Sequence, residues 1–191
     1  MYESGIELNK IVKSPLWDSQ YILNMLCEVK CIMELATDEE LSFDKYVDAD
    51  FSIGMFDILK KYCTNINESD IEAIEVTLNR FVEDLISIKN AYKVPRPYQI
   101  APTFGVTLPK KNMVSVSGVH FSYPSIHAAG SRCIAQLVSR KYQDCLGDYG
   151  RYEIFNHANR VAISRIHLGV HSVQDIREGI RLADTLCWGV S

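Results

Sequence analysis

A long amphipathic helix in the middle of the chain restricts the fold more than any other feature of this sequence. Between Ser69 and Ala91, apolar residues recur every three or four positions, which is the spacing of one helix face. Ser69 and Glu72 have the spacing of a capping box, and the helix has to end before Pro95. The apolar stripe consists of Ile71, Ile74, Leu78, Phe81, Val82, Leu85 and Ile88. A stripe of this length has to be buried against other elements, so the chain needs a packed core.

Similar patterns predict further helices on both sides of this one. They span Leu16 to Ala36, Phe51 to Tyr62, Ser125 to Tyr142, Tyr152 to His167, and Ser172 to Cys187. Strand signals are sparse, because only Met113 to Val119 alternates apolar and polar residues, over a short stretch. We therefore expect an all-α fold. We expect one domain over residues 1–191, since no repeat, linker or low-complexity tract divides the chain.

The segment from Pro95 to Pro124 differs from the rest of the chain. Prolines at positions 95, 97, 102 and 109, together with several Gly and Ser residues, predict a long loop with little regular structure. Long loops inside compact domains usually carry function, so we expect the chemistry near this segment.

The charge balance limits the classes of partner. Twenty Lys and Arg against 24 Asp and Glu give a net charge of −4, which argues against a nucleic-acid polymer as partner. The longest stretch without charged residues, Asn112 to Ser131, is rich in Ser, His, Gly and Pro, so we expect no membrane insertion. The first twenty residues show no signal-peptide pattern, so we expect a soluble cytoplasmic protein, with homo-oligomerisation left open.

The six cysteines do not form a recognisable metal or disulfide pattern. No C-x-x-C pair occurs, and nothing supplies two ligand pairs at zinc spacing, so no metal site is expected. Cys27 and Cys31 are four residues apart within a predicted helix, which places both on one face, and we expect that face in the core. A chain long enough to bury its own core needs no disulfides, so we expect reduced thiols.

Three short segments combine cations, histidines and helix starts. Each has an ordinary interpretation when it is taken alone. Lys89 and Arg96 are then solvated charges, Ser125 is an N-cap, and His171 with Asp175 is a pair at a helix terminus.

Taken together, the segments resemble the signature of the phosphatidic acid phosphatase type 2 (PAP2) and vanadium haloperoxidase superfamily, which includes the bacterial class A acid phosphatases. That signature is K-x6-R-P, then P-S-G-H, then S-R-x5-H-x3-D. The matching residues are Lys89, Arg96 and Pro97, then Pro124, Ser125 and His127, then Ser164, Arg165, His171 and Asp175. The departure is Ile126, which stands where the signature has Gly. The resemblance implies a helical bundle of the acid phosphatase/haloperoxidase type.

The residue types themselves suit phosphate chemistry. Lys89, Arg96 and Arg165 supply three cations, and charge-assisted hydrogen bonds from such groups hold a phosphate dianion. A helix that begins at Ser125 adds free N–H groups and the positive end of a dipole. The sequence has no P-loop and no Asp-rich metal motif, so we expect protein cations to replace Mg²⁺ and no cofactor to be needed.

The resemblance also implies a role for each remaining site residue. His171 is the nucleophile that forms a phosphohistidine, and Asp175 holds its other ring nitrogen. His127 protonates the leaving oxygen and then activates water. Ser125 binds a phosphate oxygen through its hydroxyl and backbone. Ile126 keeps its backbone N–H as a phosphate donor, and its side chain narrows the substrate range.

Several other aromatic and histidine residues match no motif position. We expect His120, His157 and His167 to be packing or surface residues, with a place at the pocket mouth as the alternative for His120. Phe104, Phe121 and Tyr123 form either an aromatic wall around the leaving group or part of the core.

The leading expectation is a metal-independent phosphatase that hydrolyses a soluble phosphomonoester, such as a nucleotide or a sugar phosphate. A vanadate-dependent haloperoxidase, with His171 as the vanadium ligand, is one alternative. A phosphate-binding module without turnover is another. The partner in the leading case is a small phosphorylated substrate.

Overall fold

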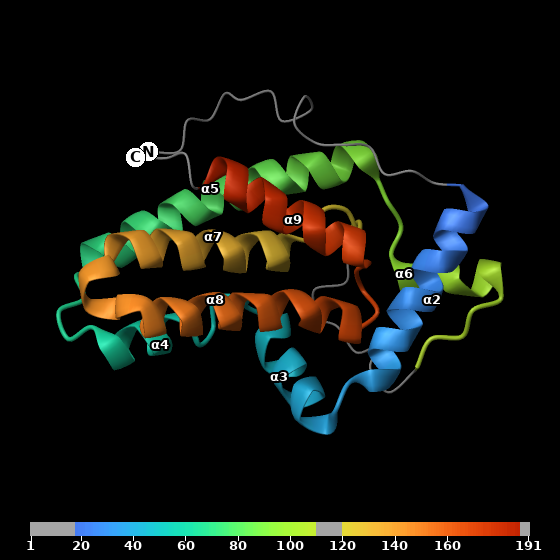
Figure 1. Ribbon diagram of the computed structural model, residues 1–191. Coiled ribbons are helices and arrows are strands. Elements are labelled where there is room, and N and C mark those ends of the chain that lie inside the picture. The colour runs from blue at the N-terminus through green and yellow to red at the C-terminus, as the bar shows by residue number, and fades with distance from the viewer. Residues whose placement is uncertain (1–17, 110–119, 188–191) are drawn as a thin grey trace.

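The computed structural model describes residues 18–109 and 120–187, and the regular structure of these residues is helical (Figure 1). The elements are α2 (Ser19–Leu35), α3 (Asp38–Asp48), α4 (Met55–Tyr62), α5 (Glu68–Tyr92), α6 (Pro97–Ile100), the 3-10 helix η1 (Ala101–Phe104), α7 (Ile126–Lys141), α8 (Gln143–His167) and α9 (Val173–Leu186). No strand occurs within the described ranges, so the all-α prediction is confirmed. The alternating segment at 113–119 lies outside them.

Side-chain caps explain where most of the predicted helices begin. Ser125 precedes α7 and accepts a hydrogen bond from the Ala128 N–H, and Ser172 forms a capping box with Asp175 at the start of α9. The prediction for α5 is wrong by about half a turn. Its cap is Asn67, whose side chain accepts from the N–H of Ser69.

Three elements differ from the sequence prediction. Helix α3 was not predicted, because its buried face includes Asp44 and Asp48 and therefore shows no continuous apolar stripe. The predicted loop from Pro95 contains the short helices α6 and η1. Helix α8 begins nine residues before the expected start at Tyr152, although Gly147 interrupts it with φ 58° and ψ −172°.

Helices α7 and α8 form an antiparallel pair at the centre of the molecule. Helices α5 and α9 pack on α7, while α2, α3 and α4 pack on α8 (Figure 1). The larger apolar core lies among α4, α5, α7, α8 and α9. A second apolar cluster lies where α2 and residues 98–108 pack near the end of α8. The two cores meet at the end of the bundle that carries the predicted site.

A close helix contact brings two of the motifs together. Gly179 on α9 lies against the start of α7, where a Cβ atom would come within 2.6 Å of the Ser125 carbonyl oxygen. At the same place, the N–H of Ser125 donates to the carbonyl of Asp175 at 3.0 Å. Glycine at this position therefore lets the second and third motifs touch through their backbones.

The cysteines do not follow the sequence prediction. Disulfides join Cys63 to Cys145 and Cys133 to Cys187, so the expectation of reduced thiols is wrong for these four residues. The remaining two, Cys27 and Cys31, are exposed. Their spacing does place them on one face of α2, but the buried face is formed by Met25, Leu26, Val29 and Met33. The prediction that they are core residues is therefore wrong.

Among the helices of the described ranges, none is both long enough and apolar enough to cross a lipid bilayer.

Candidate active site

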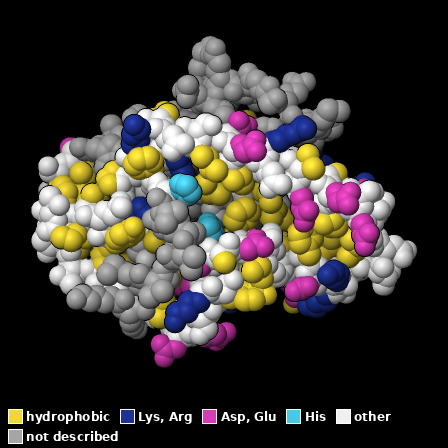
Figure 2. Space-filling view, turned by 180° about the vertical axis from the view of Figure 1, so that it is seen from behind, with side chains coloured by type: hydrophobic (Ala, Val, Ile, Leu, Met, Phe, Trp, Pro, Cys, Tyr) yellow, Lys and Arg dark blue, Asp and Glu magenta, His cyan; other side chains and the backbone are white. Residues whose placement is uncertain are grey.

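A cavity of about 170 Å³ lies at the end of the bundle where α5 ends and α7 begins. Its walls are Lys89, Arg96, His120, Ile126, His127 and His171. Figure 2 shows two histidine side chains close together on this face of the molecule. Five of the eight predicted site residues therefore line one cavity. The other three, Ser125, Arg165 and Asp175, are buried beside it.

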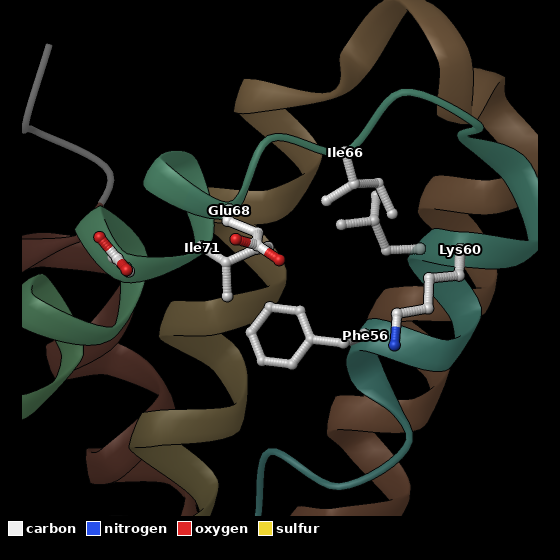
Figure 3. A pocket seen from close by; sticks show the side chains of 7 residues that line it. Phe56, Lys60, Ile66, Glu68 and Ile71 are labelled. Carbon is white, nitrogen blue, oxygen red and sulfur yellow. The ribbon is translucent and has the colours of Figure 1, made fainter.

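A larger hollow of about 510 Å³ lies between α4 and the start of α5 (Figure 3). Phe56, Leu59, Ile66 and Ile71 form most of its lining, and Lys60, Glu68 and Glu72 stand at its edges. It contains no histidine and none of the predicted residues. The smaller cavity holds the reactive groups, so the chemistry rather than the volume identifies the candidate site.

His171 lies in the loop between α8 and α9, with its ring buried. Its Nε2 atom is 3.1 Å from Nη1 of Arg96. A guanidinium can only donate, so Nε2 is the acceptor and carries the lone pair of the neutral ring. Burial, followed by the charges of Lys89 and Arg96, lowers the pKa of His171 well below its ordinary value. The ring is therefore neutral at physiological pH.

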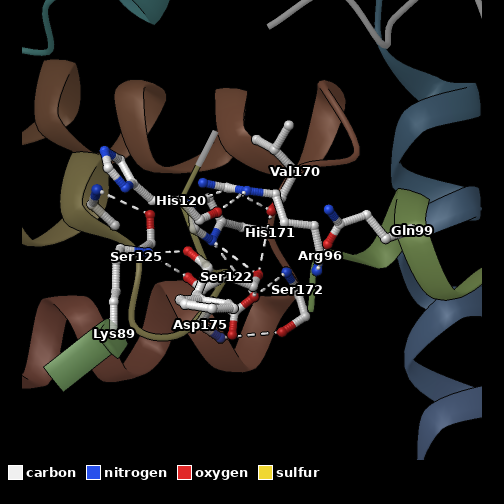
Figure 4. Close-up of polar contacts among 12 residues, drawn as sticks. Lys89, Arg96, Gln99, His120, Ser122, Ser125, Val170, His171, Ser172 and Asp175 are labelled. Atoms are coloured by element: carbon white, nitrogen blue, oxygen red, sulfur yellow. Dashed lines mark hydrogen bonds and ion pairs between the residues drawn. The ribbon is translucent and has the colours of Figure 1, made fainter. Parts of the chain in front are cut away.

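Asp175 lies on the other side of the His171 ring (Figure 4). Its Oδ2 atom is 3.5 Å from His171 Nδ1, and it accepts hydrogen bonds of 2.7 Å from both the Ser122 hydroxyl and the Ser172 N–H. Burial raises the pKa of Asp175, while the two donors act in the opposite direction.

Backbone carbonyls hold the two cations of the first motif. Lys89 donates to the carbonyls of Phe121 at 2.6 Å and Ser122 at 2.8 Å. Arg96 caps α6 and donates to the carbonyls of His120 and Val170, both at 2.8 Å. Burial, followed by the charge of Arg96, lowers the pKa of Lys89 to about 7. Burial, followed by the charge of Arg165, lowers the pKa of Arg96 to about 10.

Arg165 lies behind the cavity, at the end of α8. Its Nη1 donates to Oδ1 of Asp48 at 2.8 Å, and both side chains are at most 3% exposed. Burial lowers the pKa of Arg165, and Asp48 opposes that effect. Asp48 is the last residue of α3, the helix that the sequence did not predict.

His127 lines the same cavity as His171 and has a different environment. Its Nε2 is 2.9 Å from the backbone carbonyl oxygen of Asp48, and its ring packs edge-on against Phe51. A carbonyl can only accept, so Nε2 carries the proton and Nδ1 carries the lone pair of the neutral ring. Burial, followed by the charge of Arg165, lowers the pKa of His127 to about 3.

Ser125 and Ile126 form the start of α7. The Ser125 N–H is bonded to the Asp175 carbonyl, and its hydroxyl accepts from Ala128 N at 3.4 Å. The Ser125 N–H is therefore already used. The predicted contact of Ser125 with a phosphate oxygen would have to come from the hydrogen of its hydroxyl group. The Ile126 side chain lines the cavity, where the signature would place no side chain.

Sequence reasoning missed two residues of this network, Ser122 and Asp48. Ser122 lies in the same turn as the second motif, so its position next to the motif could have identified it as a candidate. Asp48 has no such signal, because 117 positions separate it from Arg165. His120 lines the cavity, which was the alternative considered for it. Within the described ranges, no cluster of three or more potential metal-ligating side chains was found.

Of the other singled-out residues, Phe121 is exposed and belongs to neither core cluster, while the following four are packing residues. His157 is 2.8 Å from the Ile53 carbonyl oxygen, and His167 Nδ1 is 3.0 Å from Asp44 Oδ2. Tyr123 is buried in the larger core, and Phe104 packs against the second cluster.

Comparisons with known proteins bear on the fold of this chain. No protein-family model matches the chain, and no curated protein matches it in sequence. Among solved structures, it is similar to a transmembrane PAP2-type phosphatidylglycerolphosphate phosphatase from Bacillus subtilis. The TM-score is 0.63 at 17% identity, over 90% of this chain and 84% of that one. The helical bundle of this chain is therefore similar to the fold of that phosphatase, and it agrees with the helical bundle that the three motifs predict.

Proposed function

We propose that this chain is a PAP2-superfamily phosphatase that hydrolyses a phosphomonoester through a phosphohistidine on His171, without a metal ion. The observation that carries the proposal is the orientation of His171. Its lone-pair nitrogen Nε2 is in contact with Arg96, and both residues line a cavity that a second histidine, His127, also lines.

In the first step, Lys89 and Arg96 hold the phosphoryl oxygens and neutralise their charge. Arg96 turns its Nη1 hydrogen from His171 to a phosphoryl oxygen, which frees the lone pair of Nε2. His171 Nε2 then attacks phosphorus, so the N–P bond forms as the ester P–O bond breaks. The leaving oxygen takes a proton from Nδ1 of His127, which is the nitrogen that does not contact Asp48.

His127 needs that proton before the ester can leave. The pKa of His127 is about 3, and the negative charge of a bound phosphate raises it. A phosphomonoester bound as the monoanion brings the proton with it, because the second pKa of a phosphate group is about 6.

In the second step, water replaces the departed alcohol. Nδ1 of His127, now neutral, takes a proton from this water as its oxygen attacks phosphorus and the N–P bond breaks. Inorganic phosphate leaves as the monoanion with the proton of His127, so both histidines return to their neutral forms.

The size of the cavity supports a small reacting group. A volume of about 170 Å³ is room for about six water molecules, which matches a phosphoryl group and the first atoms of its ester. We keep a soluble phosphomonoester, such as a nucleotide or a sugar phosphate, as the proposed substrate. The cytoplasmic location predicted from the sequence fits less well, because disulfides persist mainly in oxidising compartments.

The test is a screen of the purified protein against a panel of phosphomonoesters in the presence of EDTA. We expect turnover that the chelator does not change and that orthovanadate inhibits competitively, because vanadate adopts the five-coordinate geometry of the transition state. Activity that EDTA abolishes and Mg²⁺ or Zn²⁺ restores would contradict the proposal. Bromide oxidation by peroxide after vanadate loading, without phosphatase activity, would identify a haloperoxidase instead.

A further inference from the structure

The second ring nitrogen of His171, Nδ1, also needs a hydrogen-bond partner. Arg96 occupies the Nε2 side as a donor, so the neutral ring carries its proton on Nδ1. A buried N–H needs an acceptor. Two oxygens lie near it: Ser122 Oγ at 3.3 Å and Asp175 Oδ2 at 3.5 Å.

The serine oxygen is the nearer of the two and has the right partners. Ser122 Oγ is 2.7 Å from Asp175 Oδ2 and 3.3 Å from the carbonyl oxygen of Val170. A hydroxyl has one hydrogen, and a short bond to a carboxylate is the stronger choice. Ser122 therefore donates to Asp175, which leaves its lone pairs facing Nδ1 of His171 (Figure 4).

The main chain of Ser122 is fixed independently of this hydroxyl. Its N–H donates to the Val94 carbonyl at 2.7 Å, and its carbonyl accepts from Lys89 at 2.8 Å. The side chain is fully buried. The position of the hydroxyl is therefore set by the segment that carries the first motif, while its two partners belong to the third.

We propose that Ser122 is a positioning residue that links His171 to Asp175 in a chain of two hydrogen bonds, Nδ1–H to Oγ and Oγ–H to Oδ2. The proposal rests on the proposed function for its role in turnover, but the hydrogen bonds themselves do not depend on that function.

The chain has a definite task during the reaction. When Nε2 bonds to phosphorus, positive charge develops on the imidazole, and Nδ1–H becomes a stronger donor. Each bond of the chain polarises the next toward the carboxylate, so the charge is stabilised while the proton stays on Nδ1. Phosphate binding uses Lys89 and Arg96 and should depend little on the hydroxyl.

The test compares the wild type with Ser122→Ala and a matched control, Ser131→Ala. Ser131 also carries a buried hydroxyl, which lies 3.3 Å from the carbonyl oxygens of both Ala128 and Ala158 and can donate to either. We expect Ser122→Ala to lower kcat on the order of 10- to 100-fold with little change in KM, as for other groups that orient a reacting histidine. The Ser131→Ala variant should keep the wild-type kcat.

A second measurement does not require turnover. In NMR spectra of protein labelled with ¹⁵N-histidine, wild-type His171 should show the Nδ1–H tautomer, with a proton protected from solvent exchange. Ser122→Ala should shift that proton and speed its exchange. A wild-type kcat together with an unchanged Nδ1–H signal in Ser122→Ala would overturn the proposal. If the wild type hydrolyses no ester but the proton still depends on Ser122, the proposed function fails and the hydrogen-bond chain stands.

Discussion

The two histidines of the cavity are held in opposite ways. His171 is bounded by groups from the motif segments: Arg96 on Nε2, and Ser122 with Asp175 near Nδ1. His127 is held by groups from outside them: the carbonyl of Asp48 at the end of α3 contacts its Nε2, and Phe51 packs against its ring. Groups of the motif segments thus orient the proposed nucleophile, while residues outside any motif orient the proposed acid and base.

Asp48 connects the second histidine to the rest of the bundle. Its side chain pairs with Arg165 and its carbonyl faces His127, so one residue serves two groups of the site. One turn earlier on α3, Asp44 contacts His167 on α8. Two buried polar contacts therefore fix α3 against α8, and the position of His127 depends on that contact.

The largest expected effect comes from removing the nucleophile. His171→Ala should lose several powers of ten in kcat, because groups that act as a unit are strongly non-additive. It should still bind inorganic phosphate through Lys89 and Arg96, which calorimetry would measure. A rate near that of the wild type would remove His171 from its role.

The matched change on the other side of the cavity is His127→Ala. We expect a loss of about 10²- to 10⁴-fold, and a smaller loss for the first step with a good leaving group such as p-nitrophenol. The phosphohistidine should then accumulate, since its hydrolysis needs the base. Its absence in rapid-quench samples, with turnover continuing, would contradict the two-step assignment.

A smaller effect, on the stability of the fold, is expected from Asp48→Asn. This change keeps the backbone carbonyl but removes the charge beside Arg165. Removing one partner of a buried ion pair costs about 3–5 kcal/mol of unfolding free energy. Denaturant unfolding would measure this. Asp44→Asn is the control, and it should cost less because its partner is the imidazole of His167 and not a guanidinium. Equal losses of unfolding free energy in both variants would show that the Asp48–Arg165 pair stabilises the fold no more than the Asp44–His167 pair does.

Beyond the titration of the phosphate ester itself, the pH dependence should come from Lys89 rather than from His171. The pKa of Lys89 is about 7, so its charge is present below that pH and is lost above it. We expect kcat/KM to fall as the pH rises through about 7. The pKa of His171 lies well below its ordinary value, so the nucleophile stays unprotonated through the mildly acidic range. A profile that stays flat to pH 9, or a Lys89→Gln variant that keeps the same alkaline limb, would assign the titration elsewhere.

The smallest effect is expected at the departure from the signature. Ile126→Gly should leave the rate on a small ester nearly unchanged and raise it on bulkier phosphomonoesters, because it removes a side chain from the cavity wall. The cost in stability should be at most about 1 kcal/mol. A wild type that is inactive on every ester, and that this substitution switches on, would show that the natural sequence is not a phosphatase.

The sequence predicted those parts of the molecule whose signals are local. Helices α7 and α9 begin at a serine that caps them, and the periodic stripe of α5 is the buried face of that helix. Periodicity cannot show α3, because two of its buried residues are aspartates that pair with partners more than 100 positions away. It also cannot say which face of α2 is buried, so Cys27 and Cys31 were placed on the wrong side.

The two disulfides turn most of the chain into covalent rings. One ring runs from residue 63 to 145 and the other from 133 to 187, so they overlap within the second half of α7 and the turn after it. Every motif residue from Lys89 to Asp175 lies inside a ring, and Asp48 lies outside both. In the chain-entropy model, closing loops of these lengths is worth about 4 kcal/mol each.

The residues that surround His171 therefore lie within the disulfide rings. Asp48, which contacts His127, lies outside both rings, so this contact can be lost by local opening of α3 alone. Amide hydrogens of α3 should exchange with solvent faster than those of α7. If they do, local opening of α3, and not unfolding of the whole bundle, determines how often His127 loses its alignment.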